Sequence, residues 1–251
     1  MPESWIYKKF TIQSYETLES TNSLAFELAK SGIINHNHVI EAKTQTKGKG
    51  RYGRKWHSSA GNLYFSLLLK PNKDIYFSSL LSFVGVTAMG QAIVEVVNNK
   101  HCDISYKWPN DILINNKKTA GLLLESDCHK NKTNFVIIGI GVNITTNPEN
   151  TLYPATSINN EFQCQIGPKT LLTTFLDQFE TLYQNWLNFG FTATRNLWLK
   201  NASNLNKEIN VNLPNEQLKG IFKDLDHNGN LILELKDKTI KQISSGEVFQ
   251  I

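Results

Sequence analysis

The chain has 251 residues, of which 40% are hydrophobic and 19% charged, and its formal net charge at pH 7 is +4. This is the composition of a globular protein, which excludes a mainly disordered chain and allows one substantial core with a smaller second one. Met1–Phe10 lacks the apolar core of a signal peptide, and the most hydrophobic stretch, residues 78–97, is interrupted by Gln91 and Glu95. We therefore expect a cytoplasmic protein with no membrane partner.

The first predicted elements lead into a strongly basic loop. Ser20-Thr21-Asn22 is an N-cap signal for a short amphipathic helix that ends near Gly32, and a strand is expected around Val39–Lys43. Residues 47–55 then read Lys-Gly-Lys-Gly-Arg-Tyr-Gly-Arg-Lys, with five cations and three glycines. Glycines let a backbone approach a ligand closely, and the cations supply charge to phosphate or carboxylate oxygens. We expect this basic loop to grip an anion, to be poorly ordered without it and to close on binding.

Two other interpretations apply to the basic loop. Residues 48–53 fit the G-x-G-x-x-G pattern of a dinucleotide-binding turn. That turn opens a helix, whereas the next regular element here, Leu63–Leu69, has the composition of a strand, which argues against it. The loop also fits a solvated basic hairpin tip without a ligand.

The remaining elements predict a mixed sheet followed by a small barrel. Ser79–Val97 has apolar residues on most faces, as in a buried helix, and a helix from Leu171 to Leu187 ends before Gly190 and covers the sheet. We expect the helices to lie against one side of a sheet whose later strands are Ile104–Lys107, Ile112–Ile114, Thr119–Ser126 and Phe135–Ile140. From about Leu205 the predicted strands are those of a small antiparallel barrel: Glu208–Leu213, Leu218–Asp224, Leu231–Leu235 and Thr239–Ile243.

Two further motifs end predicted strands. Lys107-Trp-Pro-Asn-Asp111 places a lysine, a rigid proline turn and two polar side chains at a strand end. Alone, it also fits a tryptophan packed under a turn with Lys107 in solvent. Gly139-Ile-Gly141-Val-Asn143 ends an apolar strand, and its glycines permit a ligand to approach the backbone, although a bulge or a tight strand exit would use them equally.

The ordered set of motifs resembles a biotin protein ligase. The motifs are Ser20-Thr-Asn22, Gln45, the Gly-Lys-Gly-Arg-x-Gly-Arg-Lys-Trp56 loop, Lys107-Trp-Pro-Asn-Asp111, Lys118-x-Ala-Gly121, Glu125, Gly139-x-Gly-x-Asn143, Ala155-Thr-Ser157 and Ser245-Gly-Glu-Val248. The resemblance implies an α+β fold, with a class II synthetase-like mixed β-sheet and helices over residues 1–204 and a small SH3-like β-barrel over residues 205–251. Because few residues precede Ser20, we expect the short form of the family, without a DNA-binding domain and without DNA as a partner.

The resemblance also implies a reaction in two steps. The family uses ATP and Mg²⁺ to activate biotin as biotinyl-5'-adenylate, and then transfers biotin to a lysine of the biotin carboxyl carrier domain of acetyl-CoA carboxylase or a related carboxylase. The residues implied for biotin are Ser20, Thr21, Asn22, Gln45, Lys49, Gly50, Arg51 and Lys107. Those implied for ATP or the adenylate are Gly48, Lys49, Arg51, Arg54, Trp56, Lys118, Asn143 and Glu247. The sequence identifies no Mg²⁺ ligand.

Lys107 and Arg51 are the implied catalytic residues, because the first step joins two anions and needs cations and the exclusion of water. Either Asp111 or the departing phosphate would take the proton of the attacking lysine in the second step. Position 49 is lysine where the family usually has arginine, so we expect weaker retention of the adenylate. A lipoate ligase of related fold and a non-catalytic nucleic-acid-binding module are the alternatives, and an edge strand could support a homodimer.

Overall fold

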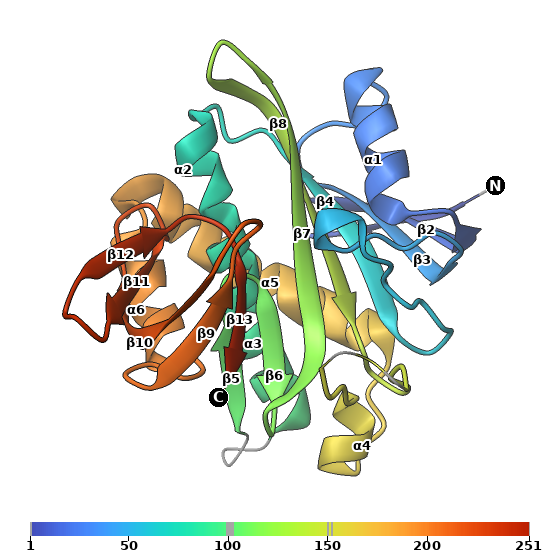
Figure 1. Cartoon of the computed structure of the whole chain (residues 1–251). Coiled ribbons are helices and arrows are strands. Elements are labelled where there is room, and N and C mark those ends of the chain that lie inside the picture. Colours follow the sequence, from blue (N-terminus) through green and yellow to red (C-terminus); the bar gives the residue numbers. More distant parts are fainter. Residues whose placement is uncertain (1, 99–102, 150, 152, 251) are drawn as a thin grey trace.

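Two β-sheets organise the chain, of which this computed structural model describes residues 2–98, 103–149, 151 and 153–250 (Figure 1). Over these residues there are an eight-stranded mixed sheet, a five-stranded antiparallel sheet and six α-helices. The large sheet has the strand order β1-β2-β3-β4-β8-β7-β6-β5, in which β2 and β3 are parallel and the other neighbours are antiparallel. Its strands are β1 (Glu3–Tyr7), β2 (Phe10–Leu18), β3 (His38–Gln45), β4 (Leu63–Leu69), β5 (Ile104–Lys107), β6 (Asp111–Ile114), β7 (Lys117–His129) and β8 (Lys132–Val142).

The large sheet begins earlier in the chain than the sequence pattern predicts, because β1 and β2 precede Ser20. These strands form a hairpin whose turn contains Lys8 at a φ of 51°. Phe10 and Ile12 of β2 are fully buried, whereas Ile6 of β1 is exposed. The apolar alternation is therefore confined to a few residues of β2, which is too short a signal to define the two strands.

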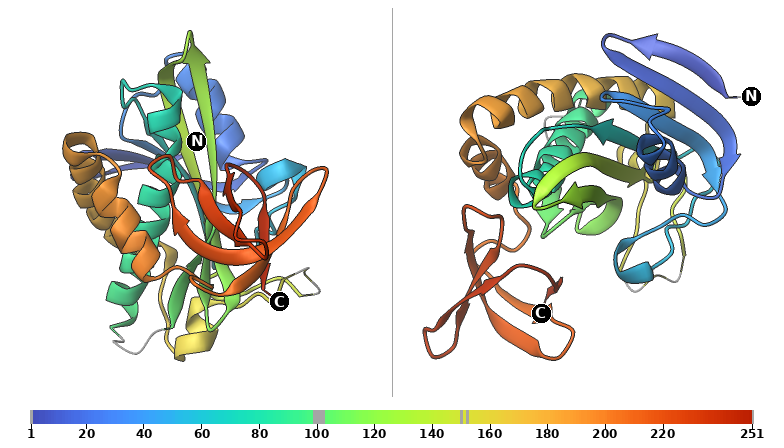
Figure 2. Two further views of the ribbon diagram at one scale, coloured as in Figure 1. Left: turned by 60° about the vertical axis from the view of Figure 1, so that its left-hand side comes forward. Right: turned by 90° about the horizontal axis from the view of Figure 1, so that it is seen from above.

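Helices cover both faces of the large sheet, so the prediction of helices on one side was wrong. α1 (Thr21–Lys30) packs on one face, which we call the α1 face, and α3 (Leu81–Val97) and α5 (Pro168–Phe189) pack on the other (Figure 2). All residues of β4 are buried, with Leu67 in the core under α3 and Leu68 in the core under α1. A central strand that is apolar on both faces needs cover on both. The other helices are α2 (Ile75–Ser79), α4 (Ile158–Phe162) and α6 (Thr192–Lys200).

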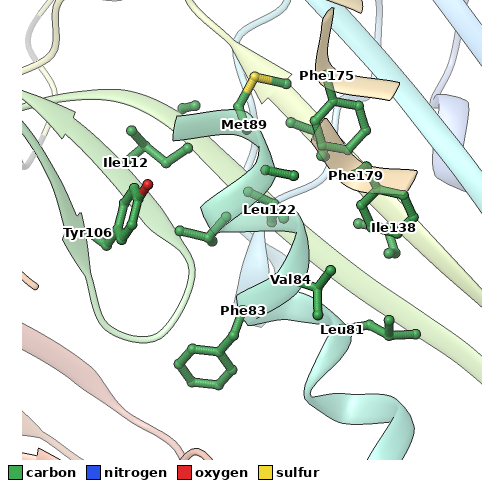
Figure 3. Close-up of a cluster of buried hydrophobic side chains, with 14 of the residues drawn as sticks. Leu81, Phe83, Val84, Met89, Tyr106, Ile112, Leu122, Ile138, Phe175 and Phe179 are labelled. Carbon is green, nitrogen blue, oxygen red and sulfur yellow. The ribbon is translucent and has the colours of Figure 1, made fainter. Parts of the chain in front are cut away.

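Helix α3 lies inside the main core, as its apolar residues on most faces predict. Figure 3 shows it between Tyr106 and Ile112 on one side and Phe175 and Phe179 of α5 on the other. The stretch Ile75–Val97 is long and apolar enough to cross a membrane by length and composition, and 67% of its most apolar window is buried inside the protein. Most of its apolar side chains are thus already packed against the sheet and the neighbouring helices, whereas Tyr76 and Val94 are exposed.

The small antiparallel sheet follows α6 and confirms the predicted small C-terminal β unit. Its strand order is β12-β11-β10-β9-β13, and the strands are β9 (Glu208–Asn212), β10 (Gln217–Leu225), β11 (Leu231–Leu235), β12 (Ile240–Ile243) and β13 (Glu247–Gln250). The last of these is an edge strand that the sequence pattern does not predict. The ring of Phe222 packs 6.5 Å from that of Trp198 of α6, and Trp108 Nε1 donates a hydrogen bond to the Gly229 carbonyl at 3.0 Å. The two sheets therefore share one apolar core, and the boundary at residue 205 stays a prediction.

Candidate active site

A pocket of about 430 Å³ lies on the α1 face of the large sheet, between the basic loop, the neighbouring ends of β6, β7 and β8, and β13. It brings together every residue predicted to contact biotin or the nucleotide except Gly48. These residues are Ser20, Thr21, Asn22, Gln45, Lys49, Gly50, Arg51, Arg54, Trp56, Lys107, Lys118, Asn143 and Glu247. Their chemical roles depend on how the fold orients each side chain.

The first turn of α1 and the buried strand β4 form a polar floor. Ser20 is the N-cap, and its Oγ accepts the backbone N–H of Ser23 at 3.4 Å. Ser66 of β4 is fully buried, and its Oγ lies 2.9 Å from Thr21 Oγ1 and 2.5 Å from Asn22 Oδ1. Because buried polar groups are costly without partners, these side chains hold one another in fixed orientations.

Gln45 extends the polar floor at the end of β3. Its Oε1 accepts the backbone N–H of Thr21 at 2.8 Å, and its Nε2 donates to Ser58 Oγ at 2.9 Å. On the other side, Asn22 Nδ2 donates to Glu125 Oε2 at 2.7 Å. The floor thus offers hydroxyl and amide groups in fixed positions, which suits a neutral polar head group with both donors and acceptors.

The basic loop folds back on itself as a tight turn. The N–H of Gly50 donates to the carbonyl of Arg54 at 2.7 Å, and the N–H of Trp56 donates to that of Gly48 at 2.9 Å. Tyr52, between these bonds, has a positive φ of 56°. The next strand or α-helix is β4, which agrees with the argument against a dinucleotide-binding turn. The dependence of the loop's order on a ligand stays a prediction.

The cations of the basic loop differ in their partners. The ion pairs are Lys47 with Glu19 at 2.8 Å, Lys49 with Glu125 at 3.9 Å, and Arg54 with Glu247. Arg51 has only neutral partners among the described residues: its Nη1 donates to Asn110 Oδ1 at 3.3 Å and its Nη2 to the Tyr52 hydroxyl at 3.1 Å. Because no carboxylate of the described chain neutralises it, Arg51 keeps its full charge for an anion in the pocket.

Lys107 ends β5 inside the pocket, so the interpretation that places it in solvent was wrong. Its Nζ lies 3.5 Å from the ring centroid of Tyr153 and 5.6 Å from that of Phe249. Burial lowers the pKa of Lys107 from 10.5 to about 8, and the charge of Asp111 opposes this shift. Asp111 itself pairs with Lys118 at 2.6 Å. Lys107 is therefore a partly desolvated cation that faces two aromatic rings and forms no ion pair among the described residues.

Trp56 covers the strand backbone at the back of the pocket. A Cβ atom on Gly141 would collide with its indole, and one on Gly121 would lie 3.0 Å from it. A Cβ atom on Gly139 would collide with the side chain of Asn22. The glycines of β7 and β8 thus admit two protein side chains, where the sequence predicted the approach of a ligand to the backbone. The indole Nε1 has no hydrogen-bond partner among the described residues.

Gly48 and Asn143 lie at the margins of the pocket. Gly48 is buried at the base of the basic loop, where a Cβ atom would lie 2.5 Å from the Trp56 carbonyl and 2.7 Å from Ser58 Oγ. Its predicted nucleotide contact stays a prediction. Asn143 Nδ2 donates to the Thr156 carbonyl at 3.2 Å, and its buried Oδ1 has no partner in the described part of the chain. This oxygen is thus an unused acceptor, but it is buried, and the predicted contact of Asn143 with a nucleotide stays a prediction.

Two family models match this chain. The Biotin/lipoate A/B protein ligase family model matches residues 14–143, and the Biotin protein ligase C terminal domain model matches residues 205–249. The chain is 32% identical over 241 residues to the bifunctional ligase/repressor BirA of Bacillus subtilis, with 93% of this chain and 72% of that protein covered. The chain belongs to the biotin protein ligase family.

Other biotin protein ligases agree with this assignment. The chain is 33% identical over 220 residues to the biotin–[acetyl-CoA-carboxylase] ligase of Paracoccus denitrificans, with 86% of this chain and 90% of that protein covered. The biotin protein ligase of Aquifex aeolicus in complex with biotin and ATP superposes with a TM-score of 0.80 at 27% identity, over 96% of this chain and 98% of that one. The biotin protein ligase of Leishmania major in complex with biotinyl-5-AMP gives a TM-score of 0.67 at 26% identity, over 93% and 98%. The α+β fold predicted from the resemblance is confirmed.

Four residues that line this biotin protein ligase pocket or support its lining side chains were not among the predicted site residues. Ser66 is the one polar residue of the otherwise apolar strand β4, a signal that could have identified it. Asn110 orients Arg51 and belongs to a motif that the sequence singled out, but it received no role there. Tyr153 and Phe249 face Lys107 from distant parts of the chain, and no local pattern marks either of them.

Proposed function

We propose that this chain is an ATP-dependent ligase that activates biotin as biotinyl-5'-adenylate and transfers the biotinyl group to a lysine of a biotin carboxyl carrier domain. Pyrophosphate leaves in the first step and AMP in the second. The observation that carries the proposal is the convergence of the polar floor, Arg51 and Lys107 in one pocket. A neutral recognition surface beside two cations that form no ion pair among the described residues suits a ligand with a polar head group and an acidic tail.

These two cations, Arg51 and Lys107, address the electrostatic problem of the first step. A carboxylate oxygen of biotin attacks the α-phosphorus of ATP, and the bond to pyrophosphate breaks. Because both reactants are anions, a cation about 4 Å away contributes on the order of 4 kcal/mol at an effective dielectric constant of about 20. Arg51 and Lys107 are suited to this role because their positive charges are not already paired with carboxylates of the described chain.

The remaining residues divide between the two substrates. We assign the biotin head group to the polar floor of Ser20, Thr21, Asn22 and Gln45, whose mutual hydrogen bonds fix their orientations before binding. We assign the nucleotide to the side of Trp56, whose indole offers a flat face for the adenine ring. Glu247 is paired with Arg54, so we assign it to holding that arginine over the nucleotide.

The second step needs a proton acceptor for the attacking amine. The amine of the carrier lysine attacks the carbonyl carbon of the adenylate, the bond to the phosphate oxygen breaks, and AMP leaves. Asp111 lines the pocket, but its carboxylate already forms an ion pair with Lys118 at 2.6 Å. We therefore favour the departing phosphate over Asp111 as the acceptor.

We propose that magnesium enters the site bound to the phosphates of ATP. Among the described residues, no group of three or more His, Cys, Asp or Glu side chains could hold a metal ion. The acidic residues Asp111 and Glu247 of the pocket are engaged by Lys118 and Arg54. The protein's donor set thus does not fit a resident magnesium site, which agrees with an ion that is bound mainly by substrate phosphates and water.

The wider setting also belongs to the proposal. We propose the carrier domain of acetyl-CoA carboxylase or a related carboxylase as the protein substrate, and the cytoplasm as the site of action. Support comes from the relative of Paracoccus denitrificans, whose name specifies that carboxylase. A homodimer and the lack of a DNA or membrane partner stay predictions.

ATP–pyrophosphate exchange tests the proposed function directly. The purified chain is assayed with magnesium and with biotin, with lipoate or with neither acid. Exchange that requires biotin supports the proposal, whereas exchange with lipoate alone would reassign the chain to lipoate ligation. No exchange with either acid, together with strongly salt-dependent binding of RNA or DNA, would support the nucleic-acid-binding alternative instead.

A further inference from the structure

Lys107 differs from the neighbouring cations of the pocket in its partners, because they pair with carboxylates and it faces aromatic rings. Two neighbouring cations of the pocket are ion-paired: Lys118 with Asp111 at 2.6 Å, and Arg54 with Glu247. Lys107 forms no ion pair within the described ranges, and two aromatic rings face its ammonium instead. The Nζ atom lies 3.5 Å from the centroid of Tyr153 and 5.6 Å from that of Phe249, and the rings are 5.1 Å apart at an angle of 35°.

We propose that Tyr153 and Phe249 form an aromatic seat for the Lys107 ammonium and so position it for adenylate formation. An aromatic face attracts a cation through its quadrupole without carrying a negative charge. A carboxylate in the same place would neutralise Lys107 and compete with the biotin carboxylate and the α-phosphate. The rings position the lysine without neutralising it, so its positive charge can act on the biotin carboxylate and the α-phosphate. Tyr153 and Phe249 are positioning residues, because they act through Lys107.

Backbone contacts that do not involve Lys107 hold the segments that carry the two rings. Tyr153 precedes Pro154, whose carbonyl accepts the N–H of Lys118 of β7 at 2.8 Å. Phe249 lies on β13, where it pairs with Asn210 of β9. The lysine, at the end of β5, thus meets one ring from the segment that follows β8 and one from the small sheet. The first half-reaction therefore depends on an edge strand of the C-terminal unit.

Matched substitutions distinguish the effect of an aromatic ring from the effect of side-chain size. Tyr153→Leu and Phe249→Leu keep an apolar side chain and remove the aromatic face, and each is expected to lower kcat for biotin-dependent exchange about tenfold. Tyr153→Phe and Phe249→Tyr keep the ring and are expected to stay within about threefold of the wild-type rate. The KM for biotin should change less than about threefold in all four variants, because the polar floor is untouched.

A second measurement asks whether the rings act through Lys107. In a chain carrying Lys107→Met, the further change Tyr153→Leu should alter the residual exchange rate less than about twofold. A further tenfold loss in that background would mean that the ring acts on the substrate or on the fold, and would overturn the proposal. It would also be overturned if Tyr153→Phe lost as much activity as Tyr153→Leu, because the hydroxyl would then be the important group.

Thermal unfolding identifies variants that fail to fold. Tyr153 is half-buried in a connecting segment, so Tyr153→Leu provides the test even if Phe249→Leu disrupts the small sheet. The inference rests on the proposed function, but the two fail differently. A wild-type chain without biotin-dependent exchange would refute the proposed function. Normal wild-type exchange, with both leucine variants within about threefold of it, would refute only the aromatic seat.

Discussion

The charge of Lys107 provides the sharpest test of the proposed first step. Lys107→Ala removes a half-buried lysine whose ammonium faces the rings of Tyr153 and Phe249. Its interaction with an anion about 4 Å away is worth on the order of 4 kcal/mol at an effective dielectric constant of about 20. If about two-thirds of that energy arises only in the transition state, the loss is about 2.7 kcal/mol, or about 100-fold in rate. We expect adenylate formation to fall at least this far.

The same variant should leave biotin binding largely intact, because the polar floor does not include Lys107. Biotin-dependent pyrophosphate exchange measures the rate, and calorimetric titration with biotin measures the binding. Lys107→Met is the matched control, since it keeps an apolar stem in the same space and removes the charge. Equal losses in rate and binding would contradict a transition-state role, as would a Lys107→Met chain with near-normal exchange.

Four further predictions follow from the geometry of the pocket. Because the charged form of Lys107 is the active one and its pKa is about 8, kcat/KM for exchange should fall as the pH rises through about 8, and a profile that stays flat to about pH 10 would count against it. Arg51→Gly should increase leakage of the adenylate into solution, measured as free biotinyl-adenylate per turnover, and unchanged leakage would contradict the assignment. Lys49→Arg should slow adenylate dissociation by restoring a planar two-point grip, and an unchanged off-rate would refute that reasoning. Gly141→Ala should displace the indole of Trp56, change tryptophan fluorescence and raise the KM for ATP about tenfold, whereas a normal KM would show that the indole moves without cost.

Local sequence patterns predicted the elements whose period extends over many residues. The long amphipathic pattern of α5 and the continuous apolar run of β4 gave both elements correctly. The hairpin of β1 and β2 was missed because its apolar residues are few and a Lys8-Lys9 turn interrupts them. The hydrophobic periodicity of α1 shows which side of the helix is apolar, but it could not show which face of the sheet the helix covers. That position depends on β4 and β8 being apolar on both faces, which only the assembled sheet reveals.

The site was predictable where its residues occur in short motifs. Arg51 and Lys107 line the pocket and belong to motifs that resemble those of biotin protein ligases, which is why they could be singled out, and their catalytic roles stay predictions. The motif could not reveal that Asn110 restrains Arg51, because that contact spans 59 positions of the chain. Similarly, the two glycines of β8 were interpreted as space for a ligand, whereas the collision with Asn22 and Trp56 is visible only once α1 and the basic loop are in place.

Strand β13 of the small sheet contributes two side chains to the pocket region, because side chains alternate between the two sides of a β-strand. Side chains at alternate positions of a strand point to the same side. Val248 is buried in the core, so Glu247 and Phe249 on either side of it point the other way. The first of these pairs with Arg54 of the basic loop, and the second faces Lys107 at the end of β5. One edge strand thus contacts both a loop cation and a sheet cation, which gives a physical reason for the small sheet to take part in a site assembled mainly from the large one.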